Sequence, residues 1–123
     1  MNAQQFIMWE QASRDTVDVK TIYIDLMGDL AAGVFLSQLI YWFLPDKKGQ
    51  TKLRVKRDGK YWLVKSRSDW WGECRVSVRQ VDRAIKTLKE MGIIETMVGK
   101  FNSNPTTHIW LPLSQLFPFL LGF

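Results

Sequence analysis

The chain has 123 residues, with 17 Lys and Arg against 12 Asp and Glu, and its formal net charge is +5. This length predicts one domain, and the hydrophobic share of 46% excludes wholesale disorder. A single Cys and a single His exclude an intrachain disulfide and a zinc site built from Cys and His of this chain, and they favour a reducing, cytoplasmic compartment.

The first 45 residues predict an arm and two helices. Residues 1–17 have few apolar anchors and lack the pattern of a secretory signal, so we expect a loose or partly helical arm. Residues 19–27 predict a short helix, and Asp29 suits the N-cap of a longer helix over residues 30–44. That helix is apolar nearly all round, which predicts a central position in the core, and it is too short to span a bilayer.

Positive charge is concentrated after this helix. Residues 1–45 carry a net charge of −3, whereas residues 46–67 carry +7. Asp58-Gly59 suits a two-residue turn, which predicts a β-hairpin over residues 51–65. Strand alternation then places Leu53, Val55, Trp62 and Val64 on one face, with Lys52, Arg54, Lys56 and Lys65 on the other beside Tyr61 and Leu63. This cationic face is either a binding surface for a polyanion or an ordinary solvated hairpin.

A capped helix and two further strands are predicted next. Residues 66–72 form a short helix, residues 73–76 a turn, and Ser77 caps a helix over residues 78–91 that ends at Gly92. The apolar stripe of this helix comprises Val78, Val81, Ala84, Ile85, Leu88 and Met91. Strands are expected over residues 93–98 and 106–111 around a loop at 99–105. The apolar tail at 112–123 is expected either to pack back on the 30–44 helix or to join a second copy.

The order of these elements is that of a winged helix-turn-helix domain. The expected fold class is therefore α+β, with a mostly helical winged helix-turn-helix at residues 18–111 between the arm and the tail. Its small antiparallel sheet combines the hairpin with the two wing strands. Residues 28–42, 58–66 and 77–94 resemble the winged-helix domains of phage and plasmid replication initiators and the DnaD-like N-terminal domain of replisome organisers.

The resemblance implies DNA binding at an origin, self-association and contacts with replication proteins. It departs from the family at the wing, where Lys100 is the only charged residue in 99–107. We expect the helix at 77–91 to enter the major groove and the hairpin at 51–65 to contact phosphates. The candidate DNA-binding residues are Arg75, Ser77, Arg79, Gln80, Arg83, Lys86, Lys52, Arg54, Lys56, Lys65 and Lys100. In this set Arg79 and Arg83 are expected to reach guanine or phosphate, and Gln80 to pair with adenine; alternatively, the charged face is only solvated.

No enzymatic chemistry is expected. His108 and Cys74 lack a partner residue for catalysis or metal binding, and there is no Gly-rich phosphate loop, so we expect no cofactor. Trp70-Trp71 is expected in the core rather than as a base-stacking platform. The leading interpretation is a homodimeric protein that binds double-stranded DNA in replication initiation. The alternatives are a winged-helix transcriptional regulator and a protein-interaction scaffold that does not bind DNA.

Overall fold

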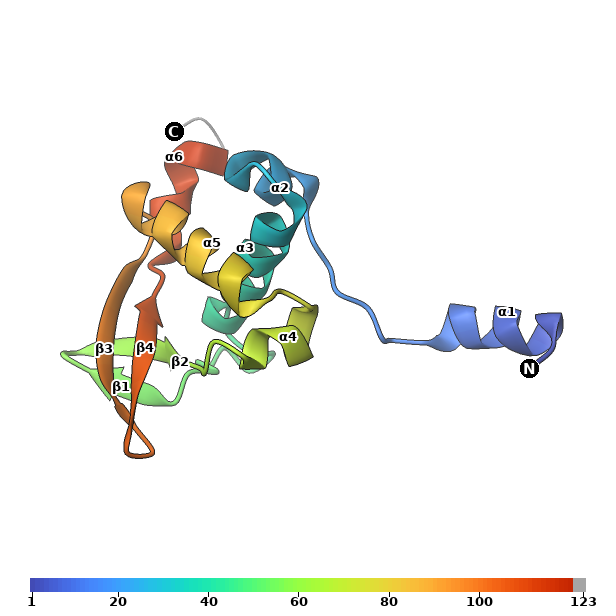
Figure 1. Ribbon diagram of the computed structural model, residues 1–123, viewed down its shortest axis with the longest axis horizontal. Coiled ribbons are helices and arrows are strands. Elements are labelled where there is room, and N and C mark those ends of the chain that lie inside the picture. Colours follow the sequence, from blue (N-terminus) through green and yellow to red (C-terminus); the bar gives the residue numbers. More distant parts are fainter. Residues whose placement is uncertain (121–123) are drawn as a thin grey trace.

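The computed structural model of the chain describes residues 1–120 and has an α+β architecture (Figure 1). Its elements are α1 (Ala3–Ala12), α2 (Thr21–Met27), α3 (Leu30–Phe43), β1 (Val55–Arg57), β2 (Lys60–Val64), α4 (Asp69–Cys74), α5 (Val78–Glu90), β3 (Glu95–Phe101), β4 (Asn104–Trp110), the 3-10 helix η1 (Leu113–Leu116) and α6 (Phe117–Leu120). The strands form one antiparallel sheet in the order β1-β2-β4-β3. Helices hold less than half of the described residues, so the expectation of a mostly helical domain was wrong.

Helix α3 lies at the centre of the core, as its sequence predicts. The Asp29 side chain accepts a hydrogen bond from the Ala32 amide at 2.8 Å and so caps the helix. Phe35, Leu36 and Leu39 are fully buried, and α3 contacts α2, α4 and α5. Helix α2 packs across α3 at a position without a side chain, because a Cβ on Gly33 would lie 2.7 Å from the Ile24 Cα. Glycine at this position therefore permits the close approach of the two helices.

The predicted β1–β2 hairpin is confirmed in its turn and in the register of the three pairs nearest the turn, but the expected strand over residues 51–54 was wrong, because β1 begins at Val55. Asp58 and Gly59 both have positive φ, and Val55 pairs with Trp62 across the strands. The expected one-sided burial was wrong for Leu63, which is only 5% exposed although it was placed on the charged face. Leu63 pairs with Ile109 of β4 and belongs to the main core, so β2 is covered on both faces.

Helix α5 is anchored by most of the apolar stripe that its sequence predicts, but the expected burial of Val78 was wrong, because this residue is 42% exposed. Val81, Ala84 and Leu88 are at most 1% exposed, and they face α3 and α4. Gly92 follows the helix with φ +74, which is the left-handed region expected for a residue after a helix end. The burial of this stripe leaves the opposite side of α5 at the surface.

The hairpin of β3 and β4 is longer than expected. We predicted strands over 93–98 and 106–111 around a loop at 99–105, but the strands run to Phe101 and from Asn104. The two residues between them, Asn102 and Ser103, have φ of 50° and 68° and make a tight turn. Ile93 and Ile94 precede β3 as buried core residues. The strands therefore form a rigid projection instead of carrying an open loop.

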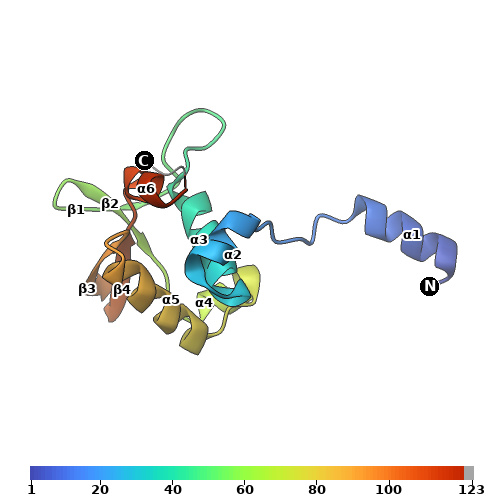
Figure 2. The same ribbon diagram turned by 90° about the horizontal axis from the view of Figure 1, so that it is seen from above.

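The two ends of the chain differ in how they contact the body. Helix α1 projects from it on the segment 13–20 and has no buried residue (Figures 1 and 2). The tail packs back, because Leu116 is buried in the core and Leu113 and Leu120 lie against it; Leu121 and Phe123 lie outside the described residues. Within residues 1–120 no single helix has the length and apolar character to cross a bilayer, and only α2 and α3 taken together meet that test, with a bend of 117° between them.

Candidate nucleic-acid interface

The exposed side of α5 carries cations whose side chains have no partner among residues 1–120. Arg79, Arg83 and Lys86 are exposed, and their side chains make no hydrogen bond or ion pair within residues 1–120. Arg79 and Arg83 lie one helical turn apart, and Lys86 follows three residues later, so the three point to the same side. The structure therefore brings together three of the predicted DNA-binding residues, with their charges directed to solvent.

The start of α5 is fixed by a reciprocal cap. The Gln80 amide donates to the Ser77 hydroxyl at 3.2 Å, and the Ser77 amide donates to Gln80 Oε1 at 2.9 Å. This bond occupies the oxygen that Gln80 needs to accept a hydrogen from adenine, because bidentate adenine recognition uses both the oxygen and the nitrogen of the amide. The predicted base contact by Gln80 therefore conflicts with its role in the cap. The role of Ser77 as the cap is confirmed.

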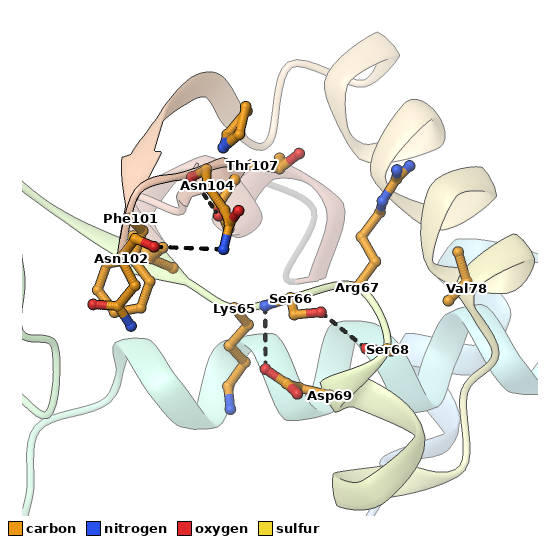
Figure 3. A pocket seen from close by; sticks show the side chains of 13 residues that line it. Lys65, Ser66, Arg67, Ser68, Asp69, Val78, Phe101, Asn102, Asn104 and Thr107 are labelled. Carbon is orange, nitrogen blue, oxygen red and sulfur yellow. Dashed lines mark hydrogen bonds between the residues drawn. The ribbon is translucent and has the colours of Figure 1, made fainter.

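A groove separates the start of α5 from the tip of the β3–β4 hairpin (Figure 3). This wing groove has a volume of about 660 Å³ and is lined by Val64, Lys65, Ser66, Arg67, Ser68, Asp69, Val78, Phe101, Asn102, Asn104, Pro105, Thr106 and Thr107. Its walls are rich in hydroxyl and amide groups, with Ser66 and Ser68 on one side and Asn102 and Asn104 on the other. Such groups bind phosphate and sugar oxygens without requiring a particular base.

Arg67 is a residue of this groove that the sequence analysis did not assign to the site. Its guanidinium donates to both carboxylate oxygens of Asp82 on α5, at 2.8 and 3.0 Å. Both side chains are about half exposed, at 55% and 46%, so this pair lies at the rim of the groove. In the sequence, Arg67 is the last residue of the positively charged segment 46–67, which could have identified it as a candidate site residue. Only the fold shows that it faces α5.

Lys65, one of the predicted phosphate contacts, forms an ion pair within the protein. It pairs with Glu73, and in Figure 3 its side chain points away from the labelled wing residues. The Glu73 carboxylate also accepts hydrogen bonds from Gln38 Nε2 at 2.8 Å and Trp42 Nε1 at 2.7 Å. Burial on its own would raise the pKa of Glu73, but these hydrogen bonds and the charge of Lys65 outweigh it and lower the pKa below its usual value. The cluster therefore locks β2, α3 and α4 together.

The Arg75 side chain binds the C-terminal end of α4. It takes the left-handed backbone conformation with φ 60°, and its guanidinium donates to the carbonyls of Trp71 at 2.7 Å and Gly72 at 3.2 Å. The guanidinium also lies 5.7 Å from the centre of the Trp71 ring. Arg75 is exposed, but these contacts direct it to the last carbonyls of its own helix, where we had expected a phosphate contact. Trp70 is confirmed as a core residue at 1% exposure and packs on Phe35, whereas Trp71 is 54% exposed.

The hairpin cations do not form one surface with α5. In Figure 2 the loop before β1 projects at the top of the body and the tip of β1–β2 projects at the left, whereas α5 lies at the bottom. Arg54 and Lys56 are exposed, whereas Lys52 donates to the Tyr41 carbonyl at 2.7 Å. Lys100 is exposed on the β3–β4 hairpin. The predicted site is thus divided into a surface around α5 and a second surface around the hairpin.

His108 and Cys74 have structural surroundings. His108 is fully buried, where we had expected a surface or capped residue, and its Nε2 accepts from Arg57 Nε at 3.1 Å. Its Nδ1 therefore carries the hydrogen and donates to the Thr106 carbonyl at 2.9 Å. Cys74 is buried, and this burial raises the pKa of its thiol. A raised pKa keeps the sulfur protonated at neutral pH and poorly nucleophilic.

No family of known proteins, no curated protein and no solved structure gave a significant match to this chain.

Proposed function

We propose that the chain is a non-enzymatic protein that binds double-stranded DNA through a winged helix-turn-helix domain at residues 18–111. The order α3, β2, α4, α5, β3, β4 supports this reading, as does the pairing of β2 with β4 next to the β3–β4 hairpin. Helices α4 and α5 are joined by the three residues 75–77. In this arrangement α5 is the recognition helix and the β3–β4 hairpin is the wing.

The observation that carries the proposal is the row of Arg79, Arg83 and Lys86 on α5. Their helix is held rigidly by its buried face, so the charges have a defined position and no partner within the described chain. A free guanidinium donates two parallel hydrogen bonds to the edge of guanine or to a phosphate. The wing groove beside the start of α5 supplies hydroxyl and amide groups for the neighbouring backbone.

Charge reversal on α5 tests this proposal. The double variant Arg79→Glu, Arg83→Glu is expected to bind mixed-sequence duplex DNA more weakly by about two orders of magnitude, because two cationic contacts become repulsive. The matched control is Arg14→Glu, Lys20→Glu, which changes the net charge equally at exposed positions outside the domain core. Equal affinities of the two variants would remove α5 from the interface. If the wild type also fails to bind duplex at low salt but captures a protein partner, the scaffold function replaces DNA binding.

We propose replication initiation as the process, on the basis of the resemblance at residues 28–42, 58–66 and 77–94. A transcriptional regulator of the same fold is the alternative. Selection of bound sequences from a random duplex pool separates the two, because it yields a site that can be located in the source genome. Repeated copies at an origin support replication, and a single palindrome upstream of a promoter supports regulation.

A homodimer is part of the proposal. Helix α1 is capped by a reciprocal pair of hydrogen bonds between Asn2 and Gln5, yet it buries none of its residues within the described chain. Phe6, Ile7 and Trp9 are about half exposed. A helix of ten residues has little stability in water without tertiary contacts. We infer that a second copy of the chain covers this apolar surface.

A further inference from the structure

A second groove adjoins the wing groove and shares Val64, Lys65 and Phe101 with it. This aromatic groove has a volume of about 750 Å³ and lies between the end of α3, the segment before β1, strand β2 and the tip of β3. Tyr41, Trp62 and Phe101 are among its lining residues, together with Lys52, Arg54 and Lys65. Aromatic and cationic side chains from segments far apart in the sequence thus meet around one cavity.

Two of the aromatic rings are available to a ligand. Tyr41 is 49% exposed on α3, and Phe101 is 40% exposed at the end of β3. Trp62 is only 5% exposed, and its indole donates to the Arg57 carbonyl at 3.0 Å, so it belongs to the fixed floor of the groove. Exposed rings on a rigid floor are the arrangement on which nucleic-acid bases stack.

The cations of the groove lie close to these rings. The Lys52 ammonium is held 3.8 Å from the centre of the Tyr41 ring by its hydrogen bond to the Tyr41 carbonyl. Arg54 is exposed, and its side chain makes no hydrogen bond or ion pair with the described residues. Asp46, the acidic residue of the lining, accepts from the Lys48 and Gln50 amides at 2.9 Å and thereby shapes its own loop. Lys65 is neutralised by Glu73, but Lys52 and Arg54 have no carboxylate partner among the described residues and remain available to a polyanion.

This combination points to an unpaired strand rather than to a duplex. In a duplex both faces of every base are covered by neighbouring bases, so no base can stack on Tyr41 or Phe101. An unpaired strand presents a base face and a phosphate at each nucleotide. Phe101 lines both grooves, but Tyr41, Lys52 and Arg54 line only the aromatic groove, so these three residues are separate from the wing groove that we assign to duplex DNA.

We propose that the aromatic groove binds an unpaired strand of nucleic acid, with bases stacked on Tyr41 and Phe101 and phosphates contacting Lys52 and Arg54. This binding extends the proposed function and rests on Tyr41, Lys52 and Arg54, which do not line the wing groove, whereas Phe101 lines both grooves. A short labelled oligothymidylate is the probe, because it forms no base pairs, and its binding is followed by fluorescence anisotropy at low salt. An oligouridylate of the same length is titrated in parallel. The oligonucleotide that binds with the higher affinity identifies whether the ligand of the groove is DNA or RNA.

The variants Tyr41→Ala and Arg54→Ala are each expected to weaken binding of the probe by about fivefold or more. Trp71→Ala and Arg14→Ala are the matched controls, an exposed aromatic residue and an exposed arginine away from the groove, and they are expected to leave the affinity unchanged. Tyr41→Phe keeps the ring and is expected to keep the affinity, which guards against a folding defect in the alanine variant.

The same titrations separate this proposal from duplex binding. Arg79→Glu, Arg83→Glu is expected to lose duplex DNA but to retain the oligothymidylate. Failure of the wild type to bind either oligonucleotide, or equal binding by the groove variants and their controls, would overturn the aromatic groove and leave the assignment of α5 untouched. Loss of oligothymidylate binding in the α5 variant alone would also overturn it, because the strand would then share the surface of α5.

Discussion

Lys65 at the end of β2 is ion-paired with Glu73 on α4, and the same carboxylate receives hydrogen bonds from two side chains of α3. Both members of the pair are largely shielded, with 18% and 21% of their side chains exposed. This contact connects the sheet to the two helices that position α5. Its strength is therefore expected to affect the whole domain.

Glu73→Gln is expected to lower the free energy of unfolding at neutral pH by about 1–3 kcal/mol, because Lys65 loses its counter-charge in a shielded position. The pKa of folded Glu73 lies below its ordinary value of 4.5, so its ionised form stabilises the fold above that value. This stabilisation is lost as the pH falls through the lower, folded pKa. Urea unfolding at a series of pH values is therefore expected to show a gap between wild type and variant that is constant toward neutrality and narrows in acid. A gap independent of pH would contradict this assignment.

Gly33 and Gly72 offer a paired test of the packing between α2 and α3. Gly33→Ala is expected to cost about 2 kcal/mol or more, because its Cβ would overlap the Ile24 backbone. Gly72 also lies in a helix, but a Cβ there meets nothing within 4 Å. Gly72→Ala is expected to stabilise the protein by about 0.5–1 kcal/mol through helix propensity. Thermal unfolding of both variants measures the difference, and equal effects would show that α2 does not cross α3 at Gly33.

The buried imidazole of His108 connects the two hairpins. Arg57 donates to its ring and also to the Lys100 carbonyl at 2.9 Å. His108→Ala is expected to destabilise the protein by about 3 kcal/mol, from the cavity and the unpaired groups that it leaves. Arg57→Ala is expected to cost about 1 kcal/mol, whereas Arg54→Ala, at an exposed position, is expected to be neutral. Chemical unfolding of the three variants gives the comparison, and a neutral His108→Ala would show that the ring has no structural role.

The dimer is tested by sedimentation at micromolar concentration. The full chain is expected to sediment as a dimer. The double variant Phe6→Ser, Trp9→Ser is expected to sediment as a monomer, because it removes both aromatic side chains from the apolar surface of α1. Ile22→Ser changes an exposed apolar residue of the body and serves as the control. A wild type that is monomeric throughout would exclude the proposed role of α1.

The elements that could be predicted from the sequence are those determined by neighbouring residues. The caps at Asp29 and Ser77, the left-handed Gly92 and the turn at Asp58-Gly59 each depend on a few adjacent positions, and all are present in the structure. The apolar stripe of α5 also follows from local periodicity. The β3–β4 turn was missed, because Asn102 and Ser103 were assigned to a loop although asparagine readily takes a left-handed conformation.

The partners of the basic side chains could not be predicted in the same way. From the sequence alone, Lys65, Arg75 and Arg79 are all basic residues with the same predicted role. In the structure, however, Lys65 pairs with Glu73, and Arg75 donates hydrogen bonds to carbonyls at the end of α4. These contacts depend on how helices and strands are arranged in space. The separation of the cationic hairpin from α5 is a further property of the arrangement, since the two are close in the sequence but the tip of the hairpin projects away from α5 (Figure 2).

The most direct test of the central claim is a titration of the isotopically labelled protein with duplex DNA, followed by the NMR shifts of its backbone amides. If α5 binds DNA as proposed, the largest shifts are expected in residues 77–86 of α5 and in the wing groove at residues 101–107, with small shifts in the 51–65 hairpin. Shifts confined to the hairpin, or none at saturating duplex, would contradict the assignment of α5 as the helix that meets DNA.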